Sequence, residues 1–201
     1  MRLVLPLVLS AAGCALLVTA SCASNRGGSD AKESKEQELD VRDVAPEAKV
    51  RLLDALHAAL AARPGEAIEA ELEGEVENGK REVSFEVAIV DESGTAWTVK
   101  VDPATGKVAS VEKEDEADEI KEIAEKREAA GRERRKLGGL LERAMKQVPH
   151  GTPVKVSFSG NKAPGRARAK LLREHDEVTL TLDAKTGEVV ETSESGAPAK
   201  R

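Results

Sequence analysis

The stretch Val101-Asp102-Pro103-Ala104-Thr105-Gly106-Lys107-Val108 decides the fold, because it recurs as Leu182-Asp183-Ala184-Lys185-Thr186-Gly187-Glu188-Val189. Each copy follows an alternating apolar run and leads into a short apolar stretch, so each predicts the turn of a β-hairpin. The Asp carboxylate can accept a backbone N–H two residues on, and the Gly supplies a positive φ where the strand resumes. We expect a turn role, not a nucleophilic one, for both threonines. The predicted turn residues are Asp102, Thr105, Gly106, Asp183, Thr186 and Gly187.

A helix and four strands are predicted around the first copy, over residues 46–112. Pro46 suits a first helical position, and apolar residues then recur at helical spacing until Pro64-Gly65 ends the helix. Four alternating apolar runs follow, with Asn78-Gly79 as the hairpin turn between the first two. We therefore predict one helix packed on a four-stranded antiparallel meander.

The same order of elements is predicted for residues 137–194. An apolar stripe of helical period runs from Leu137 to Val148, and alternating runs lead from there to the second turn copy. Matching residues of the two regions are separated by 86 positions: Gly65 and Gly151, Ile68 and Val154, Gly74 and Gly160. The offset falls to 81 between Asp102 and Asp183, so the order of elements is kept and the second copy is five residues shorter, which indicates internal duplication. The predicted fold class is therefore α+β, with two modules that each pack a helix on an antiparallel meander.

Residues 113–136 join the two modules and are mostly charged. Acidic residues open this segment and basic residues close it, which is the order that the helix macrodipole favours. We predict a solvated, charged helical linker that breaks at Gly131 or at Gly138-Gly139. A metal site in the acidic run 114–119 is a rival interpretation, but neighbouring carboxylates on a helix diverge and no calcium-loop spacing is present.

The N-terminus has the pattern of an export signal over residues 1–21, with one basic residue before an uncharged, mostly apolar run. The residues Thr19-Ala20-Ser21-Cys22 resemble a bacterial lipobox, which implies lipidation of Cys22 and attachment to a membrane through that lipid. Cys14 is a second fit to the same motif. An ordinary signal peptide or an uncleaved anchor is the alternative, since such a run can just span a bilayer.

Two segments lack the apolar side chains that would offset the entropy of ordering them. Residues 22–45 are rich in Ser, Gly, Lys and Glu, and we predict a disordered tether there. Residues 195–201 are predicted to be a disordered tail. A tether between lipid and folded domain is what a lipoprotein at a membrane surface requires.

The composition limits the classes of function. The chain has 201 residues, a formal net charge of −6 and 1% aromatic residues. We predict no nucleic-acid binding, because the chain is acidic and has almost no aromatic side chains on which bases could stack. Both cysteines lie in the first stretch, so the body of the chain has no disulfide and no thiol chemistry.

No catalytic or metal-binding constellation is found in the sequence. The three histidines, His57, His150 and His175, lie in different contexts without zinc-ligand spacing, and His57 is interpreted as a packing residue at a helix edge. Ser157 and Ser159 lack the context of a nucleophile elbow. We therefore predict that the protein is not an enzyme and has no cofactor and no specific metal.

Two outward strand faces of opposite charge are predicted, one in each module. The acidic face comprises Glu69, Glu71, Glu73 and Glu86, and the basic face comprises Lys155, Arg166, Arg168 and Lys170. Solvation and edge protection explain such faces in one interpretation. In the other, the opposite charges steer a partner, pack the modules together or contact anionic lipid.

The chain has a helix, then Pro-Gly, a strand, a central hairpin and a final V-x-V-D-x-x-T-G-x-V hairpin. This ordered set of motifs resembles the PepSY domain. The resemblance covers residues 46–112 and is carried by Ala55-Leu56-His57-Ala58-Ala59-Leu60, Arg63-Pro64-Gly65-Glu66-Ala67-Ile68 and the run from Val99 to Val108. The second region matches at Val148-Pro149-His150-Gly151 and from Thr179 to Gly187. It diverges between 160 and 176, where a stretch rich in Arg and Lys replaces the usual apolar strand.

The resemblance implies a non-catalytic envelope or extracellular domain that binds or restrains a protein partner, and it supplies no catalytic residue. We therefore expect an exported envelope lipoprotein that binds or inhibits a protein partner such as a peptidase, for instance along a strand edge. The alternative is a structural or sensory envelope protein whose acidic surface binds cations weakly.

Overall fold

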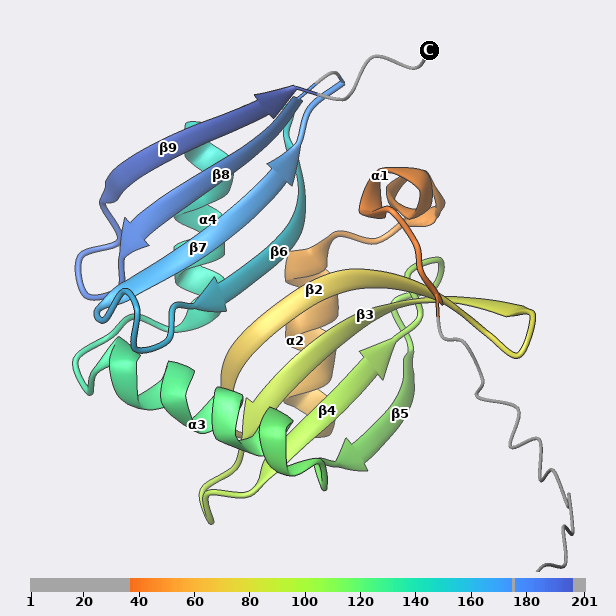
Figure 1. The fold of residues 1–201 in the computed structure, drawn as a ribbon, viewed down its shortest axis with the longest axis horizontal. Helices are drawn as coiled ribbons and strands as arrows, with labels where there is room; N and C mark the ends of the chain where they lie inside the picture. Colours follow the sequence, from red (N-terminus) through yellow and green to blue (C-terminus); the bar gives the residue numbers. More distant parts are fainter. Residues whose placement is uncertain (1–36, 175, 197–201) are drawn as a thin grey trace, which may run out of the picture. The chain divides into compact units, whose positions relative to one another are not determined.

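The structure, a computed structural model, describes residues 37–174 and 176–196, which all lie within one compact unit of the chain, Ser34–Arg201. The described residues form one sheet with helices on both of its faces (Figure 1). The helices are α1 (Val41–Val44), the 3-10 helix η1 (Ala45–Glu47), α2 (Leu52–Ala62), α3 (Ala117–Ala130) and α4 (Leu137–Gln147). The strands are β1 (Gln37–Glu38), β2 (Glu66–Glu77), β3 (Lys80–Val90), β4 (Ala96–Val101), β5 (Val108–Lys113), β6 (Thr152–Phe158), β7 (Arg166–Leu172), β8 (Asp176–Asp183) and β9 (Val189–Gly196).

All strand pairs of the sheet are antiparallel, and the strand order is β5-β4-β3-β2-β6-β7-β8-β9, with β1 added to β2. Strands β2 to β5 form one meander and strands β6 to β9 form another. The two meanders join where Glu69, Ala70 and Glu71 of β2 lie opposite residues 155–157 of β6. The predicted α+β class with antiparallel strands is therefore confirmed.

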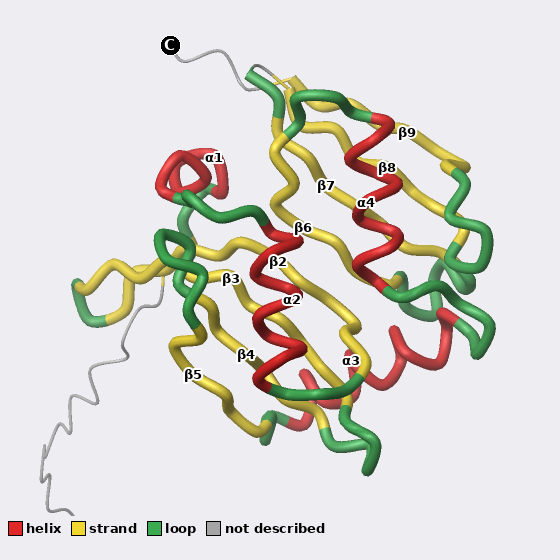
Figure 2. The backbone as a smooth tube through the Cα atoms, turned by 180° about the vertical axis from the view of Figure 1, so that it is seen from behind, coloured by secondary structure: helices red, strands yellow, loops and turns green. Residues whose placement is uncertain are grey.

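Helices α2 and α4 lie side by side on one face of the sheet, and α3 crosses the other face (Figure 2). Because alternate residues of a strand point to the same face, the apolar half of each run faces α2 and α4. These residues form the core, together with the inward stripes of the two helices. Its largest fully buried side chains are Phe85, Phe158, Leu52, Leu56, Ile68, Ile89, Leu137, Leu140, Leu141, Leu171, Leu180 and Leu182.

The start of the first long helix differs from the prediction. Pro46 lies in η1, and α2 begins only at Leu52. The reason is a tertiary contact, because the backbone N–H groups of Lys49 and Val50 both donate to the carbonyl of Pro103, at 2.8 and 3.1 Å. These hydrogen bonds hold Lys49 and Val50 against the first Asp-turn, and α2 starts after them.

The predicted disordered segments are corrected where the structure describes them. Residues 37–47, at the end of the predicted tether and just beyond it, contain β1, α1 and η1. Val44 is fully buried, and it packs so closely on Gly74 that a Cβ added there would lie 2.6 Å from its side chain. At the other end, β9 extends the sheet to Gly196, inside the predicted tail. Residues 1–36 and 197–201 lie outside the described part of the chain.

The middle segment contains a helix, as predicted, but this helix is packed against the sheet. In α3, Ile123 and Ala130 are each only 5% exposed, whereas Ile120 is 40% exposed. The helix ends at Gly131, whose φ of 79° suits a glycine. The alternative break, at Gly138-Gly139, lies inside α4, where Gly138 lies beside Leu53 and Leu56 of α2.

Candidate functional site: the charged face beneath α3

The sheet face beneath α3 gathers charged side chains from four strands. Glu69, Glu71 and Glu73 alternate along β2 and therefore share one face. The strand register extends this row of charges across the sheet, because Glu71 lies opposite Glu86 of β3, and Glu86 lies opposite Lys100 of β4. We call this surface the charged face and define it by Glu69, Glu71, Glu73, Glu86, Lys100 and Lys155.

Ion pairs tie the charged face to α3 and to β6. Lys126 of α3 forms an ion pair with the Glu69 carboxylate, and its Nζ lies 2.7 Å from Glu122 Oε1. The Lys155 Nζ lies 2.7 Å from Glu69 Oε1 and is also bonded to Glu71. Lys155, which the sequence placed on a separate basic face, is therefore part of the acidic surface.

A groove with a volume of about 560 Å³ lies between α3 and the charged face. Its walls carry many more carboxylates than ammonium groups. The acidic residues are Glu69, Glu71, Glu73, Glu75, Glu86, Glu112, Glu114, Asp115, Glu116, Glu119 and Glu122, and the basic residues are Lys100, Lys113, Lys126 and Lys155. The groove therefore has a surplus of negative charge, to which Glu114, Asp115, Glu116 and Glu119 of the acidic run contribute.

The electrostatics of the groove differ between its bases and its acids. Burial lowers the pKa of Lys155, but the carboxylates of Glu69 and Glu71 outweigh burial, so this pKa lies above its usual value. Although part of the Glu73 side chain reaches water, partial desolvation and the like charges of Glu86 and Glu71 raise its pKa to about 8. The groove therefore stabilises the charged form of Lys155 and destabilises the charged form of Glu73.

The predicted basic face of the second region is partly neutralised within its own sheet. Arg166 forms an ion pair with Asp183, and the Lys170 Nζ lies 3.4 Å from Glu177 Oε1. Arg168 is exposed. The four basic residues share one face of the sheet, since Arg166, Arg168 and Lys170 alternate along β7 and Lys170 lies opposite Lys155, but Lys155 also pairs with Glu69 and Glu71 of β2.

The first Asp-turn is closed by the side chain of Asp102. Its Oδ1 accepts hydrogen bonds from the backbone N–H groups of Ala104 and Thr105, at 2.8 and 2.9 Å. The Gly106 N–H donates to the Asp102 carbonyl at 2.8 Å, and Gly106 has a φ of 73°. The amides of Thr105 and Ala104 lower the pKa of Asp102, because they stabilise its anion.

The second Asp-turn repeats this pattern bond for bond. The Asp183 Oδ1 accepts from the N–H groups of Lys185 and Thr186, at 3.0 and 2.9 Å, and Gly187 also has a φ of 73°. In both turns the threonine hydroxyl accepts a backbone N–H two residues on. The second turn also binds the segment that precedes α4, because the Arg135 N–H donates to the Ala184 carbonyl at 2.8 Å.

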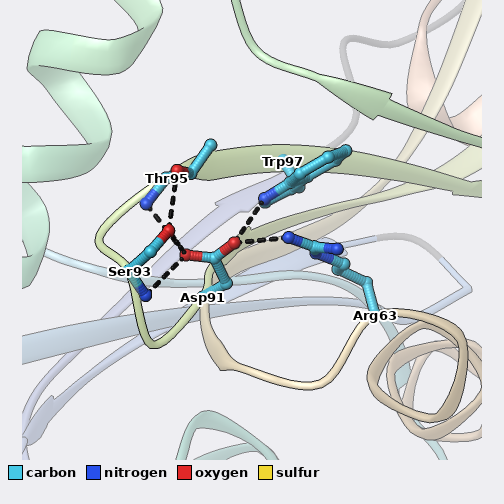
Figure 3. A network of polar contacts seen from close by, with 5 residues as sticks. All are labelled: Arg63, Asp91, Ser93, Thr95 and Trp97. Atoms are coloured by element: carbon cyan, nitrogen blue, oxygen red, sulfur yellow. Dashed lines mark hydrogen bonds and ion pairs between the residues drawn. The ribbon is translucent and has the colours of Figure 1, made fainter.

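A polar network that the sequence analysis missed surrounds Asp91, at the β3–β4 turn (Figure 3). Its Oδ2 accepts from Arg63 and from the Trp97 Nε1, the latter at 3.0 Å, and its Oδ1 accepts from Ser93 and Thr95. The Arg63 guanidinium carbon lies 3.6 Å from the centroid of the Trp97 ring. The Ser93 hydroxyl, with Thr95, Trp97 and Arg63 as further donors, outweighs burial and lowers the pKa of Asp91.

One signal for this network was present in the sequence. An Asp followed by Ser two residues later and Thr four residues later fits a side chain that caps its own turn. Nothing in the local pattern, however, pointed to Arg63, which reaches this turn from the end of α2. The network therefore joins the end of a helix to a hairpin, and it is a structural feature of the first region.

The remaining candidates are not brought together into a reactive site. His57 is exposed on α2, and His150 follows α4 with a φ of 69°. Ser157 and Ser159 are 9% and 8% exposed at the end of β6. The two histidines and the two serines therefore lie on different elements of the fold. The predicted sites Cys14, Cys22 and His175 lie outside the described residues.

Two kinds of feature are absent from the part of the chain that the structure describes. Within residues 37–174 and 176–196, no group of three or more His, Cys, Asp or Glu side chains is placed to hold a metal ion. In the same residues, no helix has both the length and the apolar character needed to cross a membrane.

The two outermost strands of the sheet have free edges. Strands β5 and β9 each pair on one side only, with β4 and β8, among the described strands. Each carries an exposed valine, Val111 at 39% and Val190 at 49%. In contrast, the outer edge of β2 is covered by β6 and β1.

Comparison with known proteins identifies one part of the chain. Residues 52–112, which include α2 and β2 to β5, match the family described as PepSY, peptidase propeptide and YPEB domain. No curated protein matches the chain. Among solved structures, the crystal structure of a "putative lipoprotein" from Clostridium difficile 630 aligns with a TM-score of 0.42 at 17% identity, covering 74% of this chain and 95% of that one.

Proposed function

Because this chain carries a PepSY domain at residues 52–112, we propose that it is a non-catalytic, exported envelope lipoprotein that binds or inhibits a protein partner such as a protease. The family description, peptidase propeptide, supports a peptidase as the partner. The absence of a catalytic pattern in the sequence is consistent with a binding role.

The observation that carries the proposal is the free edge of β5. Within the PepSY domain, one outer strand, β2, is already paired with β6, whereas β5 has no outer partner among the described strands. An exposed edge presents a row of backbone groups to which an extended segment can add as a further strand. Val111 offers that segment an apolar side-chain contact.

We further propose that residues 137–194 are a second, divergent PepSY-like module, and that residues 113–136 link it to the first over residues 46–112. Two features support this duplication. Helix α4 and β6 to β9 repeat the order of α2 and β2 to β5, and the two Asp-turns share one hydrogen-bond pattern.

Membrane attachment is proposed to occur through lipid on Cys22 after removal of residues 1–21. The support is the lipobox-like Thr19-Ala20-Ser21-Cys22. Metabolic labelling with palmitate in a bacterial host tests this, and we expect label in the wild type and in Cys14→Ser but not in Cys22→Ser. Equal labelling of both variants would contradict the choice of Cys22.

The binding function is tested by titrating the full chain, purified in detergent, against a panel of secreted metalloproteases. We expect inhibition or binding that falls at least tenfold in Val111→Lys, because a charged edge residue opposes strand addition. Val190→Lys on the free edge of β9 is the matched control and is expected to retain binding. No protease binding, together with calcium-dependent stabilisation, would instead favour a structural or sensory role with weak cation binding by the groove.

A further inference from the structure

The ladder that joins β2 to β6 is short and symmetric. It comprises three residue pairs, Glu69 with Ser157, Ala70 with Val156 and Glu71 with Lys155. Each β2 residue also has a counterpart 86 positions later on β6: Glu69 and Lys155, Ala70 and Val156, Glu71 and Ser157. Exchanging every residue for its counterpart maps the ladder onto itself. A local two-fold relation therefore centres on the Ala70–Val156 pair, as in an interface between two identical subunits. We call this ladder the seam.

The charges break this symmetry. On β2 the two flanking residues are both glutamates, whereas on β6 they are a lysine and a serine. The Lys155 Nζ contacts both Glu69 and Glu71, and these two side chains are only 11% and 22% exposed. Lys126 takes a second contact with Glu69 from α3. Each partly buried carboxylate of the seam is therefore matched by a cation.

Pairing of β2 with a second β2 would remove that match. The same register would set Glu69 and Glu71 of one strand opposite Glu71 and Glu69 of the other. Like charges directly opposite one another in an antiparallel ladder are destabilising, and more so where water is partly excluded. The β2 edge thus selects its partner by charge, since small apolar residues such as Ala70 and Val156 occupy only the centre.

We propose that the β2 edge is a strand-binding site selective for an extended segment that carries a lysine opposite Glu71, and that β6 occupies this site in cis. The ligand class is a lysine-bearing extended peptide. Because β6 is tethered to the site, its effective concentration is on the order of millimolar, so a free peptide competes poorly until the seam opens. This site is distinct from the β5 edge, and it does not rest on the function proposed for that edge.

The test opens the seam in the full chain with Lys155→Glu and then supplies the lost strand as a peptide. One peptide has the sequence of residues 150–160, and the second carries Lys155→Glu. Fluorescence anisotropy is expected to show that the opened chain binds the first peptide at least tenfold more tightly than the second. It is also expected to bind the first peptide at least tenfold more tightly than the wild-type chain does. Lys170→Glu, on the neighbouring strand β7, is the matched control and should bind like the wild type.

Equal affinity of the opened chain for both peptides would overturn the lysine selectivity. Faster amide exchange at residues 69–71 without any peptide binding would overturn the strand-binding site. If Lys155→Glu does not fold, the charge exchange Glu71→Lys with Lys155→Glu decides, since it should recover folding measured by urea titration. Failure to recover would overturn the proposal. Because these assays contain no protease, their outcome is separate from the outcome at β5.

Discussion

On the face of the sheet covered by α2 and α4, side chains such as Phe85, Phe158 and Leu180 are at most 2% exposed. On the face crossed by α3, the buried groups are carboxylates and ammonium groups, and α3 itself buries mainly Ile123 and Ala130. The first face excludes water with apolar area, whereas the second is only partly desolvated and lines a groove. Apolar burial is the larger stabilising term, whereas ion pairs largely offset the cost of their own desolvation.

This difference predicts where the stability of the protein resides. The face with α2 and α4 should control global unfolding, because its side chains belong to one continuous core. The face with α3 should control local opening and the choice of neighbours, because its contacts are few, charged and directional. Each of the following substitutions tests whether the two faces contribute separately to the stability of the protein.

The largest effect is expected from Phe158→Ala, on the apolar face. Removing a phenylalanine that is 1% exposed should lower the free energy of unfolding by about 3–5 kcal/mol, through lost burial and the cavity that remains. Urea denaturation followed by Trp97 fluorescence measures it. Val190→Ala, at an exposed position of β9, is the control and should change stability by less than about 0.5 kcal/mol. A loss at Phe158 as small as this would break the comparison.

A smaller effect is expected from Ile123→Ala, the main apolar contact of α3. We expect the free energy of unfolding to fall by about 2 kcal/mol, which is at the low end for a buried isoleucine. The value is low because α3 buries few other apolar side chains. Amide exchange should rise within residues 117–130 before it rises in the core strands. Ile120→Ala, one turn earlier and 40% exposed, is the matched control. Global unfolding without local opening of α3 would show that the two faces are not independent.

The Asp-turns that contact the chain before α2 and α4 should both lose stability when their glycines are replaced. Gly106 and Gly187 both have a φ of 73°, so Gly106→Ala and Gly187→Ala should each cost about 1–2 kcal/mol of backbone strain. Gly187→Ala should cost more in total, because its added Cβ would also collide with the Arg143 side chain. Thermal unfolding monitored by circular dichroism measures the loss. Gly139→Ala, within α4 and with open space around it, should be neutral or slightly stabilising. Equal costs would show that Arg143 moves away from the added methyl group without loss of stability.

The smallest effect concerns Glu73 in the groove, where partial desolvation and the like charges of Glu86 and Glu71 raise its pKa to about 8. Between about pH 4.5 and 8 the folded chain then binds more protons than the unfolded chain, so this group reduces stability as pH rises. Glu73→Gln should therefore stabilise the protein at pH 9, by less than about 1 kcal/mol because the side chain is exposed. The gain should vanish near pH 4. Glu191→Gln on β9 is the control, and a gain independent of pH would remove this explanation.

Much of the apolar face could be predicted from the sequence. Alternating runs placed β2 to β9 near their observed positions, because the period of a half-buried strand is local. The repeated Asp and Gly of the two turns specified their conformation for the same reason. The misplaced start of α2 shows the limit of this reasoning, since the amides of Lys49 and Val50 donate to Pro103, which is distant in sequence.

The charged face could be predicted only in part. Alternation placed Glu69, Glu71 and Glu73 on one surface, but it could not show that Lys155 lies among them. That position depends on which strand edges pair, and β2 could have paired with any strand of compatible charge. Arg63 at Asp91 was missed for the same reason, because a guanidinium that reaches across from a helix end leaves no periodic trace.

The sequence by itself determined α3, α4 and β2 to β9 approximately, the two turns and the apolar side of those strands, because spacing and turn chemistry act between residues close in the chain. Only the tertiary structure decided that β2 and β6 meet, that α3 packs on the charged face, and that residues 37–47 are ordered. These depend on contacts between distant segments, where charge complementarity and close packing such as Val44 on Gly74 select one arrangement among several.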